Sequence, residues 1–250
     1  MIQGRNAPLT ARSVLASTLL GVDPPELPVA YLVHVAGLFG INDNRARVAL
    51  SRMVGSGETT TDGAGRYRLA GRLLDRQARQ LASRAGHSGG WSGDWRVVVV
   101  TTAGSSAEIR SKRRSALRFA RLGELREGTW MRPDNIKIQL DPEVELDSTL
   151  LLARPDGDQP ALAARLWDLE GWGQRARQLM ESMEARPTRK PADLAPGFEL
   201  SASVLRHLQA DPLLPDELLP AGWPGGALRE QYDGWDAGYR SVLDKWSRTT

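Results

Sequence analysis

Cysteine is absent from this sequence, histidine is scarce and no apolar run is long. Without cysteine there can be no disulfide, no thiolate metal site and no cysteine nucleophile. No apolar segment approaches the roughly 20 residues that span a bilayer, and the N-terminal stretch 1–5 lacks the apolar core of a signal peptide. We therefore expect a soluble, cytoplasmic protein without a membrane partner.

The signatures of common enzyme sites are missing as well. The three histidines, His34, His87 and His207, lie far apart and have no metal-ligand spacing. There is no G-x-S-x-G sequence, no Walker loop and no glycine fingerprint between a strand and a helix. His34 is expected on a helix surface. We predict no catalytic residue, no metal and no cofactor, and we expect a protein that is not an enzyme.

Charge is distributed unevenly along the chain. Its 250 residues include 33 basic and 30 acidic side chains, for a net charge of +3. Residues 1–132 carry 20 Arg and Lys against 10 Asp and Glu, whereas residues 133–250 carry 13 against 20. A basic half joined to an acidic half is typical of a polyanion-binding module. Because only four of the basic residues are Lys, a general bias toward arginine is the alternative explanation.

The first 86 residues have the pattern of a winged helix-turn-helix. Amphipathic helices are predicted over 10–20, 28–40 and 42–54, a β-hairpin over 58–69 and a further helix over 71–83. In the third helix Ala46, Ala49, Leu50 and Met53 form a small apolar stripe, which lets the opposite face enter a DNA major groove. Asn42 is a favourable N-cap for this helix.

The residues expected to contact DNA lie on that outer face and on the hairpin. Arginine can bind guanine with two hydrogen bonds, and asparagine can bind adenine in the same way. Two arginines of the hairpin are two positions apart, on one face of a strand, as a phosphate or minor-groove contact requires. A solvated helix face is the alternative. The predicted DNA-binding residues are Asn42, Asn44, Arg45, Arg47, Ser51, Arg52, Arg66 and Arg68.

Strands and helices alternate in the middle of the chain. Strands are predicted over 95–100, 128–132 and 148–153, with 135–140 as a further candidate, and helices over 105–122 and 160–169. The unbroken Val97–Val100 run indicates a strand covered on both faces. This order is compatible with a ferredoxin-like α/β sandwich. The helix over 105–122 is strongly basic and is predicted to face largely outward, either as a second polyanion site or as a solvated surface.

The last third of the chain is predicted to be helical and is rich in tryptophan. Trp172, Trp223, Trp235 and Trp246 are expected to be core or interface anchors. Three prolines exclude regular structure from Asp211–Pro220, whereas its four leucines indicate that it still packs.

Two breaks divide the chain. The first, Ala85–Gly90, is small and polar, and the second, Arg186–Pro191, holds two prolines. We predict an α+β multidomain fold: a winged helix-turn-helix domain over 1–86, a linker over 87–94, a ferredoxin-like central domain over 95–170 and a C-terminal helical domain over 171–250.

Several short sequences together resemble the PaaX family of phenylacetate-degradation repressors, over about residues 10–246. Arg47–Met53 at the end of the third helix also matches, with Met53 where the family usually has leucine. The other matching segments are Trp95-Arg96, Trp130-Met131-Arg132-Pro133, Leu166-Trp167-Asp168-Leu169 and, most specific, Asp211–Pro220 followed by Trp223-Pro224-Gly225.

The resemblance implies a homodimeric bacterial regulator, usually a repressor of aromatic-acid breakdown genes, that binds an operator in double-stranded DNA. It also implies an aryl-CoA effector, phenylacetyl-CoA in the best-known members. Basic and aromatic side chains of the central domain are the candidates to bind such an acyl-CoA: Arg110, Arg113, Arg114, Arg118, Trp130 and Trp167.

The middle domain of the family resembles a small nuclease fold of CRISPR systems, whose nuclease members place an aspartate at the end of the first strand. Here that strand is followed by Thr101-Thr102-Ala103-Gly104, without a carboxylate. The middle domain is therefore expected to serve dimerisation and ligand sensing. The alternatives are a metal-dependent, nuclease-like enzyme and an adaptor whose winged helix binds another protein.

Overall fold

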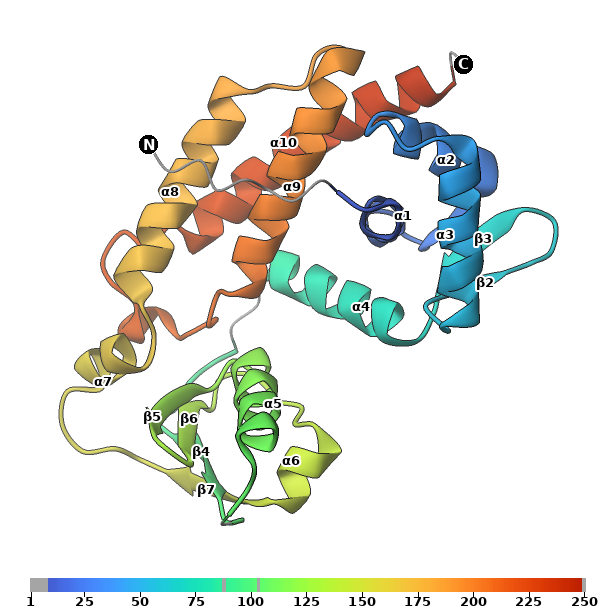
Figure 1. Cartoon of the computed structure of the whole chain (residues 1–250). Coiled ribbons are helices and arrows are strands. Elements are labelled where there is room, and N and C mark those ends of the chain that lie inside the picture. Colours follow the sequence, from blue (N-terminus) through green and yellow to red (C-terminus); the bar gives the residue numbers. More distant parts are fainter. Residues whose placement is uncertain (1–8, 87–88, 103, 249–250) are drawn as a thin grey trace. The chain divides into compact units, whose positions relative to one another are not determined.

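The computed structural model describes residues 9–86, 89–102 and 104–248 (Figure 1). The chain forms two compact units. Unit 1 contains residues 1–84, 179–206 and 230–250, and unit 2 contains residues 85–178 and 207–229. The long helices α8 (Leu169–Ala185), α9 (Leu194–Gln209) and α10 (Gly225–Ser247) therefore contribute residues to both units. Residues 87 and 88 of the predicted linker over 87–94 lie outside the described residues.

Unit 1 begins with the predicted succession of helices and hairpin. Its helices are α1 (Ala11–Leu20), α2 (Val29–Gly37), α3 (Asp43–Gly55) and α4 (Gly71–Ala85), and its strands β2 (Thr59–Thr61) and β3 (Arg66–Leu69) form the hairpin. The strand β1 (Glu26–Pro28) was not predicted, because it lies at the junction of the first two predicted helices and has only three residues. It pairs antiparallel with β3, and the sheet order is β1-β3-β2.

The core of unit 1 joins the three N-terminal helices to the C-terminal part of the chain. Leu15 of α1, Leu32 of α2 and Leu50 of α3 are completely buried in one cluster. Leu243 and Trp246 of α10 pack against the same cluster. The apolar stripes of the helices are thus covered by each other and by a segment about 200 residues away in sequence.

His34 is not the helix-surface residue that its position in α2 predicts. Its ring stacks on Trp246 of α10, with 3.8 Å between the ring centroids and 26° between the planes. Its Nε2 is buried and has no hydrogen-bond partner among the described residues. The sequence around His34 could not show this, because the partner ring comes from the other end of the chain.

Unit 2 is built on a four-stranded antiparallel sheet in the order β5-β6-β4-β7. Its strands are β4 (Trp95–Val100), β5 (Gly123–Arg126), β6 (Thr129–Pro133) and β7 (Ser148–Ala153). The other elements that lie wholly in this unit are the helices α5 (Ala107–Phe119), α6 (Pro142–Leu146) and α7 (Gln159–Leu166), and the 3-10 turn η2 (Asp216–Leu218). A second 3-10 turn, η1 (Pro191–Asp193), follows the Arg186–Pro191 break in unit 1. Residue 103, in the stretch after β4, lies outside the described residues.

The candidate strand over 135–140 is wrong, and β5 stands in its place in the sheet. Residues 135–140 are turn and irregular chain. Ile138 and Leu140 pack against the core beside α5, while the side chain of Asn135 donates to the carbonyl of Leu213 at 2.9 Å. The alternating apolar residues of 135–140, which suggested a strand, therefore pack against the core from an irregular segment.

Both faces of β4 carry packed side chains, as its valine run predicts. Trp95 and Val97 lie in a cluster with Leu214 and Leu218, from the Asp211–Pro220 segment and η2. Val98 lies in a second cluster with Leu117 of α5, and both Trp95 and Val98 are completely buried. The irregular segment therefore packs on one sheet face and α5 on the other.

A buried arginine fastens this irregular segment to the sheet. Arg132 of β6 is completely buried, and its guanidinium donates to the carbonyl oxygens of Arg121, Pro133 and Leu213 and to the Asn135 side chain. Burial away from water lowers the Arg132 pKa to about 9. The donors of Arg132 thus satisfy carbonyl groups that an irregular backbone would otherwise leave unpaired.

Within unit 2 the tryptophans are packing residues, as expected. Trp172 stacks on His207 at 4.3 Å and on Trp223 at 4.5 Å between ring centroids. Burial also lowers the pKa of His207. None of the helices in the described parts of the chain is long and apolar enough to cross a membrane.

Candidate nucleic-acid interface

Helix α3 has one buried and one exposed side. Ala46, Leu50 and Met53 are at most 1% exposed and hold the helix in the core of unit 1. The Asn42 side chain caps the helix by accepting from the Arg45 amide at 2.9 Å. Asp43 in the first turn and Arg52 in the last turn both complement the helix dipole. The helix is therefore rigidly mounted, with its outer side free for a ligand.

All the predicted DNA-binding residues of α3 lie on that exposed side. Arg47 pairs with Asp43 at 3.0 Å, and both side chains are more than half exposed. Among the described residues, Arg45 and Arg52 have no ion-pair partner. An exposed pair such as that of Arg47 contributes at most about 1 kcal/mol, so a nucleic acid could displace it. The exposed set on this helix is Asn42, Asn44, Arg45, Arg47, Ser51 and Arg52.

The two hairpin arginines meet at a single carboxylate. Glu26 of β1 accepts from Arg66 at 2.5 Å and from Arg68 at 2.6 Å. Its pKa is lowered, first by the hydrogen bond from Arg66 and then by that from Arg68. Glu26 stands opposite Arg68 in the β1–β3 register, which brings the three side chains together. The hairpin therefore presents two cations that share one counterion.

The tip of the hairpin is shaped by an aspartate and two glycines. The Asp62 carboxylate accepts from the amides of Ala64 at 2.8 Å and Arg66 at 2.9 Å, and its pKa is lowered by these bonds. Gly63 and Gly65 have φ values of 76° and 99°, in a region that favours glycine. At the base of the hairpin, Glu58 pairs with Arg12 of α1, and this bond lowers the Glu58 pKa.

The arginines proposed for an acyl-CoA do not form one converging set. Arg113 is only 9% exposed, where an outward position was expected, and it pairs with Asp147 at 2.6 Å. Arg114 pairs with Glu124 at 2.9 Å. Arg110 and Arg118 remain exposed, and Arg110 donates to the Ser105 carbonyl. Arg113 thus faces inward, where Asp147, the residue that follows α6, is its counterion.

The two tryptophans proposed for the same ligand lie in different clusters. Trp130 is 3% exposed and belongs to the cluster with Val98, on the α5 side of the sheet. Trp167 is half-buried in the cluster of Trp95, and these two rings stack with 6.4 Å between centroids. The sheet separates the two indoles, so they do not line one ligand pocket.

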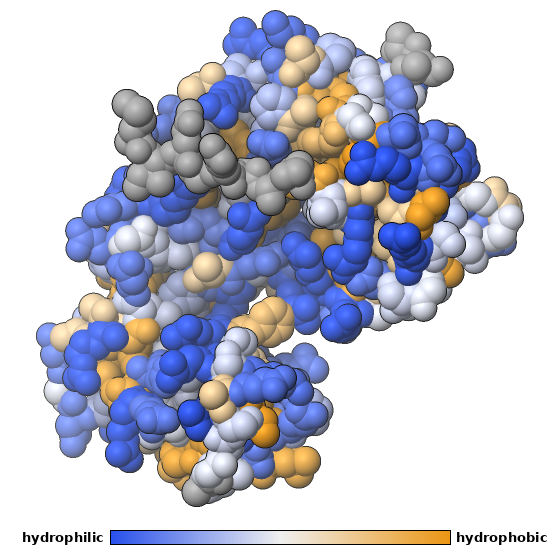
Figure 2. Space-filling view, viewed as in Figure 1, coloured by the Kyte–Doolittle hydropathy of each residue, from blue (hydrophilic) through white to orange (hydrophobic). Residues whose placement is uncertain are grey.

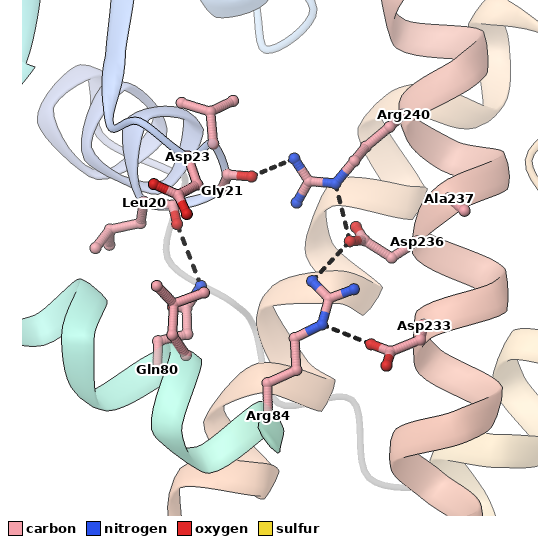
Figure 3. A pocket seen from close by; sticks show the side chains of 11 residues that line it. Leu20, Gly21, Asp23, Gln80, Arg84, Asp233, Asp236, Ala237 and Arg240 are labelled. Atoms are coloured by element: carbon pink, nitrogen blue, oxygen red, sulfur yellow. Dashed lines mark hydrogen bonds and ion pairs between the residues drawn. The ribbon is translucent and has the colours of Figure 1, made fainter. Parts of the chain in front are cut away.

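A cavity of about 300 Å³ lies in unit 1 between the end of α1, α4 and α10 (Figure 3). Asp236 is 2% exposed and accepts from Arg84 and Arg240, each at 2.9 Å. Arg240 also donates to the carbonyl of Gly21, and Arg84 donates to Asp233 at 2.6 Å. The arginine donors that face the cavity are therefore already engaged by the protein.

Three family models match successive parts of the chain. They are described as PaaX-like protein, PaaX protein central Cas2-like domain and PaaX-like protein C-terminal domain, and they match residues 10–73, 88–148 and 163–248. The chain belongs to the PaaX family. This is a family of transcriptional regulators of phenylacetate catabolism, and membership implies DNA binding.

A solved structure is similar to this PaaX-family chain over nearly its whole length. It is that of uncharacterized protein Rv0674 from Mycobacterium tuberculosis, which is 40% identical, with a TM-score of 0.76. The similarity covers 94% of this chain and 98% of that one. No curated protein matches the chain.

Sequence reasoning missed two acidic residues of this PaaX-family chain. Glu26 lies between the first two predicted helices, and its role depends on the β1–β3 pairing that places it opposite Arg68. Asp236 carried no signal, since its partners Arg84 and Arg240 come from two helices and only folding brings them together.

Proposed function

We propose that this protein is a homodimeric repressor that binds operator DNA through the exposed side of α3 and the β2–β3 hairpin. The observation that carries the proposal is a helix held by three buried side chains whose outer side is polar and basic, followed by a hairpin with two arginines. This is the arrangement of a winged helix-turn-helix. A helix so mounted can enter the major groove without losing its packing.

The residues divide by the contact they can make. Arg45 and Arg52 are free to bind base edges, and Arg47 can exchange Asp43 for a guanine. Asn44 and Ser51 lie on the same exposed side. Arg66 and Arg68 are suited to phosphates, whose charge competes with that of Glu26. Asn42 is committed to the cap through its oxygen, which leaves only its amide donors.

The sheet of unit 2 supports a ferredoxin-like central fold. Its order β5-β6-β4-β7, with α5 between the first two strands in sequence, follows that topology. We infer that this part serves dimerisation and effector binding. An aryl-CoA would release the operator if it bound better to a dimer whose DNA-binding helices are wrongly spaced. Of the predicted ligand residues, Arg110 and Arg118 are the exposed cations available to its phosphates.

The decisive experiment is fluorescence anisotropy on the intergenic DNA upstream of the protein's own gene. Binding is measured at two salt concentrations, with and without a panel of aryl- and alkyl-CoA thioesters. We expect tight binding that weakens steeply with salt, because phosphate contacts release counterions, and release by one aryl-CoA. Arg52→Ala should weaken binding, while Arg126→Ala, which removes an exposed arginine of β5, should not.

The outcomes separate the proposals. Binding that no thioester changes would keep the regulator and remove the CoA effector. Binding no better than to random DNA, or an equal loss in the Arg52 and Arg126 variants, would overturn the assignment of α3 as the DNA-reading helix. Mg²⁺-dependent cleavage of the probe would overturn the repressor in favour of a nuclease.

A further inference from the structure

Helix α5 of unit 2 carries a row of three exposed arginines. Arg110, Arg114 and Arg118 follow one another at intervals of four residues, so they lie along one side of the helix. At 1.5 Å per residue, this arginine row is about 12 Å long. Its length is therefore close to the axial length of about three to four phosphates on one strand of B-DNA.

The packing of α5 determines where the arginine row points. On the inner side of the helix Leu117 is completely buried and Arg113 is only 9% exposed, held by its ion pair with Asp147 at 2.6 Å. At the start of the helix the Ser106 side chain accepts from the Ile109 amide at 3.3 Å. Because its inner side and its first turn are both held, α5 presents the arginine row to solvent in a fixed orientation.

The arginine row carries more positive charge than its neighbours balance. Arg114 pairs with Glu124 of β5 at 2.9 Å. Arg110 donates to the carbonyl oxygen of Ser105, which is not a counterion. In the part of the chain that the structure describes, Arg118 has no ion-pair partner. One carboxylate therefore stands against three guanidinium groups.

The other charges of α5 lie further round the helix and are balanced there. Lys112 pairs with Glu143 at 2.6 Å, as Arg113 does with Asp147. Glu108, the acidic residue of α5, comes one turn before Lys112 and lies on the side of the helix away from Arg110. The unbalanced positive charge of α5 is thus concentrated in the arginine row.

Small side chains lie beside the arginine row. Ala107, Ser111 and Ser115 are exposed on the same side of α5, again at intervals of four residues. Figure 2 shows hydrophilic and pale surface where α5 lies. Since no long apolar side chain stands between the arginines, an extended polyanion can approach the helix closely.

We propose that the arginine row of α5 is a second DNA-binding surface, which holds the phosphates of one strand of duplex DNA. Arginines that meet phosphates read no base, so this contact is independent of sequence. The pair of Arg114 with Glu124 does not prevent it, because Arg114 is about half exposed and a phosphate can take the place of Glu124.

This inference deepens the proposed function, on which it rests. In the proposed function only unit 1 contacts DNA, through the exposed side of α3 and the hairpin. The arginine row adds a contact from unit 2 that strengthens binding to every duplex and leaves the choice of operator to α3.

The salt dependence of DNA binding by the full chain tests the arginine row. On B-DNA each phosphate contact contributes about 0.9 to the slope of log affinity against log salt. A triple variant with Ala at the three positions of the row should lower this slope by about 2–3. It should also weaken binding to the operator and to random duplex alike, by roughly tenfold or more.

The matched control removes the same charge from elsewhere in unit 2. Its three alanines replace the exposed arginines Arg165 of α7 and Arg175 and Arg177 of α8. This control should keep the slope of the parent. An equal change of slope in the two triple variants would overturn the proposal.

A single substitution decides the matter if the triple variant fails to fold, as judged by circular dichroism. Arg118→Ala removes an exposed side chain that has no ion pair among the described residues, so the fold should be kept. It should lower the slope by about 1, whereas Arg165→Ala should leave it unchanged. A slope in Arg118→Ala equal to that of the parent would overturn the contact.

Site-specific crosslinking gives a second readout, which does not depend on charge. The chain has no cysteine of its own, so Ser111→Cys places a single thiol beside the arginine row. Labelled with a photoreactive aryl azide, this protein should crosslink to duplex DNA on irradiation. The matched control is Ala164→Cys on α7, which is also exposed and should not crosslink. Equal crosslinking of the two proteins would contradict a contact at α5.

Comparison with Arg52→Ala distinguishes this inference from the proposed function. A loss of operator binding in Arg52→Ala, with no loss in the triple variant of α5, would refute the arginine row alone. A loss in the triple variant, with parent-like operator binding by Arg52→Ala, would refute α3 as the DNA-reading helix and leave the arginine row standing. A triple variant that binds DNA like the parent but is no longer released by an aryl-CoA would assign these arginines to the effector and overturn the DNA contact.

Discussion

Removing the Asp236 carboxylate should destabilise unit 1 more than removing any exposed acid. Asp236 is 2% exposed and is shared by Arg84 of α4 and Arg240 of α10 (Figure 3). In Asp236→Ala both guanidinium groups lose this partner in a poorly hydrated place, although Arg84 keeps Asp233 and Arg240 keeps the Gly21 carbonyl. The helix α10 would then lose one of its two ion pairs with Arg84 of α4, and Arg240 would lose the carboxylate beside which it donates to Gly21.

The size of the effect follows from how far the two arginines are buried. Breaking a fully buried ion pair costs about 3–5 kcal/mol. The side chains of Arg84 and Arg240 are 28% and 38% exposed, so water recovers part of that loss. We expect a decrease of about 2–3 kcal/mol in the free energy of unfolding, which corresponds to about 4–12 °C in melting temperature for a protein of this size.

Urea denaturation followed by tryptophan fluorescence, with a thermal scan, measures this change. Asp233→Ala is the matched control, because the Asp233 side chain is 55% exposed and its pair with Arg84 should contribute less than about 1 kcal/mol. The reasoning would be refuted if Asp236→Ala were as stable as the parent, or if Asp233→Ala cost as much as Asp236→Ala.

Three further predictions concern DNA and pH. In an anisotropy titration, Arg47→Ala or Arg52→Ala should each lose about 1–3 kcal/mol of operator binding and relax specificity, whereas Arg68→Ala should weaken binding to operator and random duplex alike. Equal small losses on both DNAs for all three variants would contradict this division between base-reading and phosphate-binding arginines. Glu26→Gln frees the hairpin arginines and should raise affinity for random duplex about 2–10-fold, and an unchanged affinity would show that Glu26 does not compete with phosphate. Glu58 has a lowered pKa in the folded state, so its pair with Arg12 stabilises the protein above its ordinary pKa of 4.5, and this contribution is lost as the pH falls below that value. Glu58→Gln should therefore be less stable than the parent in urea at pH 7, and the difference should shrink as the pH falls from 4.5 through the lowered pKa of Glu58. A difference that stays the same over this pH range would exclude the ion pair as the cause.

Local patterns were sufficient for the helices and the hairpin of the proposed DNA-binding region. The α3 stripe and the Asn42 cap depend on residues three or four apart, so the sequence alone predicts them. The hairpin was equally accessible, because Asp62 and the glycines beside it determine a turn within a few residues. The same periodicity predicts which residues of α3 face away from the core. All the DNA-binding residues predicted on this helix are exposed in the structure.

Long-range partners were not accessible in this way. The ring on which His34 stacks is about 210 residues away in sequence, and Arg113 faces inward because Asp147 meets it from beyond α6. Trp130 and Trp167 looked like one aromatic set, but the strands that carry or flank them put them on opposite faces of a sheet. The helices α8, α9 and α10 contribute residues to both compact units, a division that depends on contacts between distant segments.

The sequence by itself determined the N-terminal helices, the hairpin, the family and the basic outer side of α3, because each depends on residue types at short, fixed spacings. Only the tertiary structure decided which charges are already paired and which edge is free. Arg66 and Arg68 share Glu26 because β1 joins the sheet, and β7 is an edge strand because, among the described residues, only β4 pairs with it. Pairing and exposure depend on contacts between distant segments, which no local pattern encodes.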